Sequence, residues 1–453
     1  MKLTYADSIN YLLNLIDHER TSARLPRQKR IYDLQIMNSL LESMDNPHKD
    51  SRTIHVAGTK GKGSTSSMCD SILNSSGYTT GFYSSPHLHT FRERIRLGTN
   101  EITEVLFSQL VDAVKPYSER ITQGDVSLFE FMTAMAFSCF SQENVDFQTI
   151  EVGLGGRLDA TNVVVPEIAI ITSISLDHTA ILGDSIEQIA FEKSGIIKPG
   201  CEVVISPQEE AVYGTLNDIC ESRGVRSIIV GKDVTWECSG QNDNRQQATI
   251  NGRLGKYEID LPLLGDFQLE NASSVLAAME ILMERGAMIS EQSIYDGFHK
   301  VSWPCRMEYI SDSPAILLDG AHNPYSMKVL LQNLKSKFRN SNLIFITGFS
   351  KDKNVSEMVN LISEMDGIVI TTESRHPRSL AFRDLAQLFM ESGVTQVYPL
   401  ASVNEAVKEA IEFVSDDTVI VVTGSLFVAA EAREYILDIT PEIYPDLLPG
   451  NSI

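Results

Sequence analysis

The stretch from Ile54 to Ser67, "IHVAGTKGKGSTSS", decides the fold of the first part of the chain. The run "TIHVAG" predicts a β-strand, and "STSSMCDSILNSSG" predicts a helix with Met68, Ile72 and Leu73 on one face and Gly77 at its end. The loop between them aims backbone N–H groups and a helix N-terminus at an anion. We therefore predict a nucleotide phosphate site made by Gly58, Thr59, Lys60, Gly61, Lys62, Gly63 and Ser64.

The loop departs from the usual phosphate-loop pattern at one position that matters for metal binding. Lys62 is followed by Gly63, where that pattern has a Ser or Thr whose hydroxyl holds magnesium. A plain turn with Ser64 as helix cap is one alternative. A dinucleotide site is another, although the third glycine and the ribose-binding acid are missing. Three glycines and two lysines within six residues favour the phosphate site, so magnesium there needs oxygens from other segments.

The composition is that of a soluble enzyme. The 453 residues suffice for two or three domains, and 43% of them are hydrophobic and 22% charged. A formal net charge of −22 argues against nucleic-acid or membrane partners, so an anionic ligand must meet a local positive cluster. Six scattered cysteines without a C-x-x-C pair favour a reducing cytoplasm. Residues 1–20 predict an amphipathic helix rather than a signal peptide, and no apolar run is long enough to span a membrane.

Strand-like and helix-like patterns alternate along the chain, which is typical of α/β folds with parallel strands. The first predicted strands are "RTIHVAG", "YTTGFYSS", "DFQTIEVG", "EIAIITSIS" and "CEVVIS", followed by a hairpin in "ATINGRLGKYEID" and a helix in "NASSVLAAMEILMERG". After the irregular "VSWPCRMEYI", strands recur in "AILLDGAH", "NLIFITG", "GIVITT", "TQVYPL" and "TVIVVTGS". We predict a large N-terminal phosphate-loop α/β domain, residues 1–300, and a smaller C-terminal Rossmann-like α/β domain, residues 301–453.

Two residues at predicted strand ends are candidates for the missing oxygens. Ser85 precedes Pro86, so its side chain can face the phosphates, although a simple turn serine is the alternative. Glu151 ends a buried apolar strand, and a carboxylate in such a place usually has a partner or a metal. Magnesium accepts such oxygens alongside those of phosphate.

His178 and Lys193 are further candidates. His178 follows another strand end, next to Asp177, and a structural loop histidine is the alternative. Lys193 shares the apolar helical stripe of Ile186, Ile189 and Ala190. Buried lysines lose their charge readily, and a neutral amine can react with carbon dioxide to form an anionic carbamate. A lysine that extends its ammonium to water is the alternative.

Eight motifs in one order carry a family resemblance. They are "HVAGTKGKGST", "SSPHLHTFRERI", "LFEFMTAMAF", "EVGLGGRLDATNVV", "SLDHTAILG", "IAFEKSGIIKPG", "LDGAHNP" and "VTGSL". Together they resemble the folylpolyglutamate synthase and dihydrofolate synthase family, within the Mur-type ATP-dependent ligases. The resemblance implies a monomeric enzyme that uses ATP and two magnesium ions to add L-glutamate to tetrahydrofolate, to dihydropteroate, or to both.

The resemblance also implies roles for matching residues. One magnesium is implied at Ser85 and Glu151, and a second at His178 and a carbamylated Lys193. The other implied roles are ATP contacts at the loop around Lys62 and at Asn271, Arg306 and Asp319, catalysis by Asp319 and His322, and glutamate handling by Arg94 and Ser425. His322 could accept the proton that the attacking amine loses, or serve as an orienting donor.

The proposed chemistry agrees with these residue types. Joining a carboxylate to an amine needs activation, so ATP would first convert the carboxylate to an acyl phosphate. Phosphoryl transfer to an anion needs nearby cations, and Lys62 with the two magnesium ions would supply them in an acidic protein.

Three positions depart from the family pattern, and two other functions compete with this interpretation. Cys305, Phe267 and Asn354 stand where the family usually has Gly, His and Asp, but none is a predicted metal ligand.

A peptidoglycan-type Mur ligase carries a nucleotide-sugar domain before the loop, and we expect the 57 residues before Gly58 to be too few for such a domain. A non-catalytic nucleotide-binding protein would need neither metal ligands from four segments nor "DGAHNP". The sequence leaves the preferred acceptor open.

Overall fold

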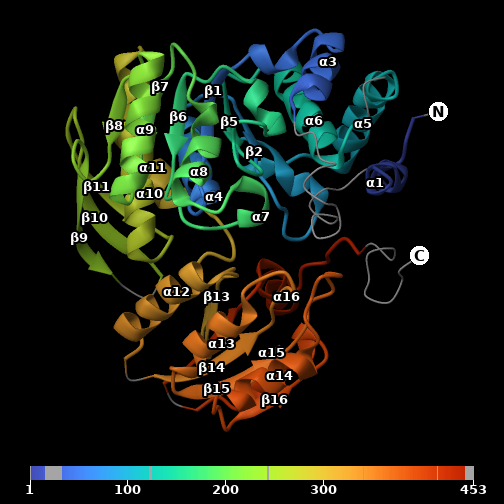
Figure 1. The fold of residues 1–453 in the computed structure, drawn as a ribbon, viewed down its shortest axis with the longest axis vertical. Helices are drawn as coiled ribbons and strands as arrows, with labels where there is room; N and C mark the ends of the chain where they lie inside the picture. The colour runs from blue at the N-terminus through green and yellow to red at the C-terminus, as the bar shows by residue number, and fades with distance from the viewer. Residues whose placement is uncertain are drawn as a thin grey trace. The chain divides into compact units, whose positions relative to one another are not determined.

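The computed structural model describes residues 2–15, 33–121, 125–241, 244–339, 341–415 and 417–443 (Figure 1). The chain divides into two compact units. The first comprises Met1–His87, Phe91–Pro262 and Asp266–Ser302, and the second comprises Leu88–Thr90, Leu263–Gly265 and Trp303–Ile453. Within the described residues, none of the helices combines the length and the apolarity that a membrane span requires.

The first unit is built on an eight-stranded mixed sheet with the strand order β4-β3-β2-β5-β1-β6-β7-β8. Its strands are β1 (Arg52–Ala57), β2 (Thr80–Tyr83), β3 (Ile95–Leu97), β4 (Asn100–Glu101), β5 (Phe147–Glu151), β6 (Ile168–Ile171), β7 (Glu202–Ile205) and β8 (Ser227–Ile229). The six strands β2-β5-β1-β6-β7-β8 pair in parallel with their neighbours. Strands β3 and β4 add an antiparallel edge beside β2. The five predicted strands are confirmed, and the short β3, β4 and β8 are additions.

Helices cover both faces of this sheet. The alternation of side chains along a strand puts Ile205 in a core shared with α8 and α9, whereas Ser206 on the other face contacts Ser274 of α10. The helices are α1 (Tyr5–Leu13), α3 (Gln35–Ser43), α4 (Lys62–Ser75), α5 (Glu104–Ser118), α6 (Leu128–Gln142), α7 (Thr179–Leu182), α8 (Ile186–Lys193), α9 (Glu210–Arg223), α10 (Asp266–Glu284) and α11 (Glu291–Lys300). Short 3-10 turns are η2 (Pro47–Lys49), η3 (Phe91–Arg94), η4 (Ala160–Val163) and η5 (Ser194–Ile196).

Local chemistry explains where the helices begin. Helix α1 starts with a capping box in which Thr4 and Asp7 bond each other's backbone N–H groups. The predicted N-terminal helix is thus confirmed for these residues, and residues 16–20 of that prediction lie outside the described chain. Helix α10 begins at Asp266, five residues earlier than the predicted start at Asn271.

The predicted hairpin belongs to a separate three-stranded antiparallel sheet. Strands β10 (Gln246–Asn251) and β11 (Lys256–Leu261) pair as expected, and β9 (Thr235–Gln241) adds a third strand beside β10. The turn between β10 and β11 is held by Glu280 of α10, which accepts the N–H groups of Arg253 and Leu254 at 2.8 Å each.

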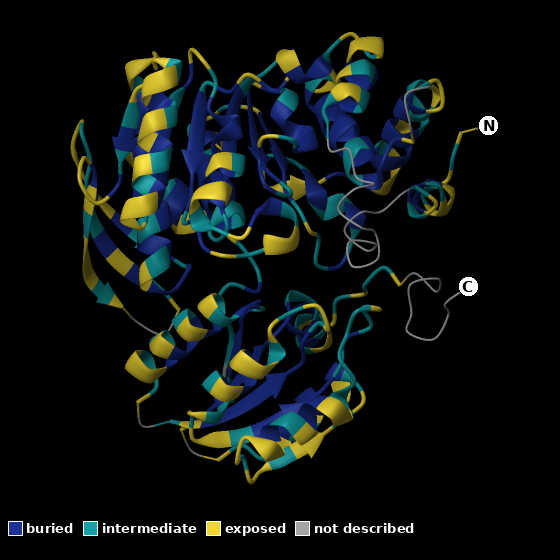
Figure 2. Ribbon diagram, viewed as in Figure 1, coloured by how far each residue is buried: buried dark blue, intermediate teal, exposed yellow. Residues whose placement is uncertain are grey.

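The second unit contains a six-stranded sheet with the order β12-β13-β17-β14-β15-β16. All pairs are parallel except β12 with β13. Its elements are β12 (Glu308–Asp312), β13 (Ala315–Leu318), α12 (Pro324–Lys337), β14 (Asn342–Thr347), α13 (Val355–Ser363), β15 (Gly367–Thr371), α14 (Phe382–Glu391), β16 (Val397–Pro399), α15 (Val403–Glu412), β17 (Thr418–Thr423) and α16 (Leu426–Leu437). In both units the central strands of the large sheet are buried and the outer helix faces are exposed, whereas β9 of the three-stranded sheet is largely exposed (Figure 2).

Residues Leu88–Thr90 belong to the second unit although the chain on either side of them belongs to the first. Leu88 packs on the core formed by β13, β14, β17, α15 and α16. The imidazole Nδ1 of His89 lies 3.1 Å from a carboxylate oxygen of Glu434, and the His89 carbonyl accepts the N–H of Glu442 at 3.0 Å. This three-residue segment is therefore anchored by side chain and backbone alike.

Candidate active site

The predicted phosphate and metal residues of the first unit converge on one edge of its sheet. The order β2-β5-β1-β6 brings the carboxyl ends of four parallel strands side by side. Glu151 ends β5 in register with Val56 of β1, two residues before Gly58. Ser85 follows β2 by two residues, and the loop that follows β6 carries His178. Sheet topology thus gathers segments far apart in the sequence.

The phosphate loop has a backbone that requires glycine. Gly61 caps α4 with φ 87°, and a Cβ added there would lie 2.4 Å from Oδ1 of Asn271. Asn271 donates to Gln268 at 3.0 Å, and Gln268 donates to the hydroxyl of Ser64 at 3.2 Å. Gln268 therefore links Asn271 and Ser64, two predicted nucleotide-binding residues that lie 207 positions apart in the sequence. The sequence analysis did not single out Gln268.

Lys62 belongs to this loop, and Lys193 contacts it from helix α8. Lys62 is the first residue of α4, and the N–H groups of this first turn point toward the loop. Lys193 ends α8, is 4% exposed, and donates from Nζ to the carbonyl of Gly58 at 2.8 Å. The predicted apolar stripe is confirmed, because Ile189 and Ala190 are fully buried beside it.

Burial lowers the pKa of Lys193 well below its usual value. The positive charges of Lys62 and Lys60 lower it further, whereas Asp177 and Asp159 raise it. Lys193 is thus a buried amine inside a cluster of charged groups, not a lysine that extends to water.

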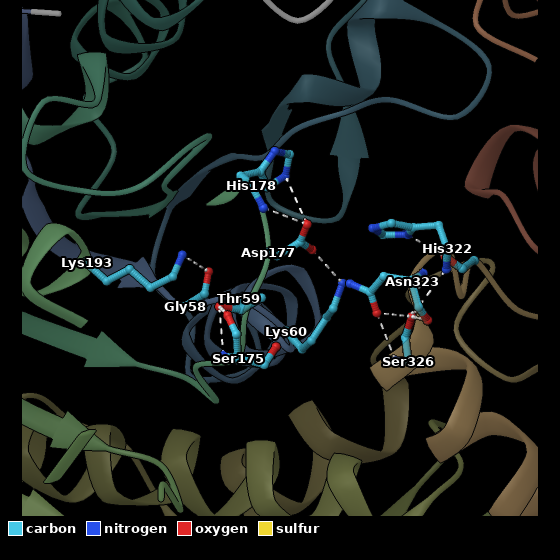
Figure 3. A network of polar contacts seen from close by, with 11 residues as sticks. Gly58, Thr59, Lys60, Ser175, Asp177, His178, Lys193, His322, Asn323 and Ser326 are labelled. Carbon is cyan, nitrogen blue, oxygen red and sulfur yellow. Dashed lines mark hydrogen bonds and ion pairs between the residues drawn. The ribbon is translucent and has the colours of Figure 1, made fainter. Parts of the chain in front are cut away.

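Lys60 and His178 both contact Asp177 (Figure 3). Nζ of Lys60 lies 3.2 Å from the Asp177 carboxylate, and the backbone N–H of His178 donates to that carboxylate at 2.9 Å. His178 itself has its side chain 47% exposed and adopts a left-handed backbone with φ 51°.

The loop that follows Glu151 is organised by a buried carboxylate that the sequence interpretation missed. Asp159 accepts the N–H of Leu154 at 2.8 Å and both the N–H and the hydroxyl of Thr161. Thr161 in turn bonds Nε2 of His55, whose pKa burial lowers to about 3. Burial raises the pKa of Asp159, and the charge of Lys62 acts against this shift. The motif "RLDATN" contains both Asp159 and Thr161, but the sequence does not show which groups they contact, so their role could not be predicted.

Arg94 lies on the short turn η3 and is 3% exposed. Its Nε donates to Nδ1 of His87 at 3.0 Å, so that ring nitrogen carries no proton. The carbonyl of Arg94 accepts the N–H of Ser84, next to Ser85, at 3.1 Å. Arg94 is thereby bonded both to the side chain of His87 and to the backbone beside Ser85.

In the second unit, Asp319 and His322 flank a tight loop after β13. The Asp319 carboxylate accepts the N–H of Met307 at 2.9 Å and that of Ala321 at 2.8 Å. His322 donates from Nδ1 to the carbonyl of Gly320 at 2.8 Å, which fixes its tautomer when neutral. A Cβ on Gly320 would lie 2.5 Å from Arg306, so Arg306 lies against this loop.

Ser425 caps α16, and its hydroxyl accepts the N–H of Phe427 at 3.2 Å. The residue is 5% exposed. A helix N-terminus favours negative charge, so this position is compatible with a carboxylate ligand as well as with a plain capping role.

Comparison with known proteins places both units in one class. Residues 56–279 match the Mur ligase middle domain, and residues 305–426 match the Mur ligase glutamate ligase domain. With the phosphate loop at the sheet edge, these matches define a Mur-type ligase. The chain is 33% identical over 422 residues to the dihydrofolate synthase/folylpolyglutamate synthase of Bacillus subtilis, covering 88% of this chain and 93% of that protein. The chain belongs to the folylpolyglutamate synthase/dihydrofolate synthase family.

Two further relatives agree with this assignment. A probable bifunctional folylpolyglutamate synthase/dihydropteroate synthase of Halobacterium salinarum is 32% identical over 437 residues, which is 95% of this chain but only 51% of that relative. This chain therefore spans about half the length of that protein. The Mycobacterium tuberculosis folylpolyglutamate synthase, solved in complex with ADP and AMPPCP, superposes with a TM-score of 0.85 at 30% identity, covering 96% of this chain and all of that one.

Proposed function

We propose that this protein is an ATP-dependent ligase that joins L-glutamate to a folate acceptor through an acyl phosphate. The observation that carries the proposal is the edge of the first sheet, where a glycine-rich loop and the segments bearing Ser85, Glu151 and His178 follow four neighbouring parallel strands. Residues 1–300 are proposed to bind ATP and residues 301–453 to handle glutamate.

The nucleotide phosphates are proposed to rest on the loop. Lys62 and the first N–H groups of α4 face developing negative charge, which such groups stabilise strongly in a dry site. Asn271 lies against Gly61 and would contact the nucleotide from the side of α10. In the second unit, Arg306 is proposed as a further nucleotide contact, and Asp319 holds the backbone of Met307 beside it.

The residues proposed to hold magnesium fit that ion in part as they stand. Glu151 is 5% exposed at the end of its strand, and with the Ser85 hydroxyl it offers the hard oxygens that magnesium prefers. Among the described residues no group of three His, Cys, Asp or Glu side chains lies together as a metal cluster. When bound, magnesium would offset the charge that gathers during phosphoryl transfer.

The second metal requires an anionic oxygen on Lys193. Its amine, with a lowered pKa, is proposed to attack the carbon of carbon dioxide, forming an N–C bond and releasing one proton. The resulting carbamate supplies an oxygen ligand near the loop that carries His178. Because Nζ already lies 2.8 Å from the Gly58 carbonyl, the remaining N–H can keep that bond.

Glutamate is proposed to be held by Arg94 and Ser425 and deprotonated by His322. The Nδ1–H bond to Gly320 directs the basic Nε2 away from its own backbone, which suits a proton acceptor. Arg94 supplies a guanidinium for a carboxylate, and Ser425 supplies a helix N-terminus.

The function is tested by ADP release from ATP and magnesium. We expect release that needs both glutamate and a folate acceptor, with tetrahydrofolate and dihydropteroate supplied in turn. A peptidoglycan-type ligase would instead need a nucleotide-sugar acceptor, and a non-catalytic binding protein would release no ADP with either. Product mass distinguishes the outcomes, because ligation adds one glutamate residue to the acceptor.

A further inference from the structure

His178 holds a left-handed backbone conformation next to Asp177. Its φ of 51° and ψ of 35° lie in the left-handed region, which is unfavourable for a residue with a Cβ. Nearly half of its side chain is exposed, and its imidazole Nε2 lies 3.8 Å from a carboxylate oxygen of Asp177, so the side chain and the backbone N–H of His178 both face this carboxylate. Strained residues of this kind persist where neighbouring groups over-determine them.

The phosphate loop supplies part of that restraint. The N–H groups of Thr59 and Lys60 donate to the Ser173 carbonyl at 2.8 and 3.2 Å. The Thr59 hydroxyl donates to the Ser175 carbonyl and accepts the Ser175 N–H, each at 3.1 Å. These contacts fix the loop after β6 as far as Ser175, three residues before His178.

The Lys60–Asp177 pair extends the restraint to the last residue before His178. Its N–O distance is 3.2 Å, and the two side chains are only 20% and 12% exposed, so the charges are partly withdrawn from water. The same carboxylate accepts the His178 N–H at 2.9 Å through its other oxygen, as Figure 3 shows. Truncating one partner of such a pair leaves the other charge without compensation.

We propose that Lys60 is a positioning residue, which holds Asp177 and thereby sets the left-handed turn that presents His178 to the second metal. The inference rests on the proposed function, because it takes His178 as a metal ligand. It gives Lys60 a role different from the phosphate contact predicted from the sequence. The phosphate loop would thus contribute to the metal site with one lysine and to the nucleotide site with the other.

The test separates metal binding from nucleotide binding in the full chain. The variants are Lys60→Ala, Asp177→Asn and the double variant, since asparagine can still accept the His178 N–H. Calorimetry measures ADP affinity in EDTA, and electron paramagnetic resonance measures Mn²⁺ affinity with ADP present. Lys300→Ala is the matched control, because Lys300 forms a surface pair with Asp296 at 3.3 Å.

We expect each single variant to weaken Mn²⁺ binding by about tenfold or more, as the loss of supporting contacts around a metal ligand typically does. The double variant should be no weaker than the singles, and ADP affinity in EDTA should stay within about twofold throughout. Weaker ADP binding in EDTA for Lys60→Ala but not for Asp177→Asn would make Lys60 a phosphate ligand and overturn the proposal. Losses of Mn²⁺ affinity that add up in the double variant would overturn it as well. If Lys60→Ala does not fold, Asp177→Asn alone tests the proposal. If Lys60 only contacts phosphate, the Mn²⁺ affinity of Asp177→Asn should equal that of the parent, and this result would overturn the proposal. Parent protein that binds ADP and Mn²⁺ but releases no ADP with any acceptor would refute the proposed function alone.

Discussion

Asp70 gives a test of the first unit that needs no substrate. It lies on α4, eight residues after Lys62, is 6% exposed, and burial raises the pKa of its carboxyl to about 7 from 3.8. Because the folded state holds the proton more tightly than the unfolded chain, Asp70 costs stability as the pH rises through this interval. With about 1.4 kcal/mol per pKa unit, the cost grows by roughly 2–3 kcal/mol between pH 5 and pH 8.

The variant Asp70→Asn removes this titration and keeps the size of the side chain. Relative to the parent, its free energy of unfolding should therefore rise by about 2–3 kcal/mol between pH 5 and pH 8, as measured by urea unfolding with far-UV circular dichroism. Asp146→Asn is the control, because hydrogen bonds from Thr79 lower the pKa of the exposed Asp146. Its contribution is lost only as the pH falls through that lowered pKa, so its difference from the parent should stay constant over this range. An Asp70→Asn difference that is equally flat would show that the carboxyl stays ionised, with Arg96 compensating its burial, and would refute the reasoning.

Substitutions at three further residues test the proposed site. Lys62→Ala should lower ADP release by about a hundredfold or more with an unchanged circular dichroism spectrum, and normal turnover would exclude a phosphate role. Lys193→Ala and Lys193→Arg should both lose most activity, with acetate restoring part of it in the alanine variant only; an active arginine variant, or a crystal structure with magnesium beside a bare amine, would exclude the carbamate. Arg94→Ala should raise the glutamate concentration for half-maximal rate by about tenfold or more, and a loss confined to ATP affinity would show that Arg94 serves the other substrate.

The central strands were predictable because they are continuous apolar runs. β1, β5 and β6 are buried on both faces, and such strands stand out from their surroundings. Strands β3, β4 and β12, which lie at or next to a sheet edge, were missed, since they are short or partly exposed and carry no such run. Helix α10 was predicted too short because its first turns contain polar residues, of which Gln268 is fully buried by its bonds to Ser64 and Asn271.

The site was predictable where a residue's own neighbours in sequence reveal its environment. The burial of Lys193 followed from the spacing of its stripe, and the structure confirms it. The bond from Lys193 to Gly58, the pairing of Lys60 with Asp177, and the hub at Asp159 could not be predicted in this way. Each joins loops that only the order of strands in the sheet brings together, and sequence periodicity carries no information about that order.

The three-residue segment Leu88–Thr90 matters when the second unit is produced as a separate fragment. Cutting the chain after Ser302 would yield a C-terminal fragment that lacks this segment, and with it the imidazole that faces Glu434 and the side chain that covers part of the core. Such a fragment would expose an apolar surface beside a carboxylate that is otherwise 8% exposed. A synthetic peptide spanning residues 86–92 would supply this segment, whereas Leu263–Gly265 of the second unit would still be missing. Added in trans, it should improve the solubility of the fragment.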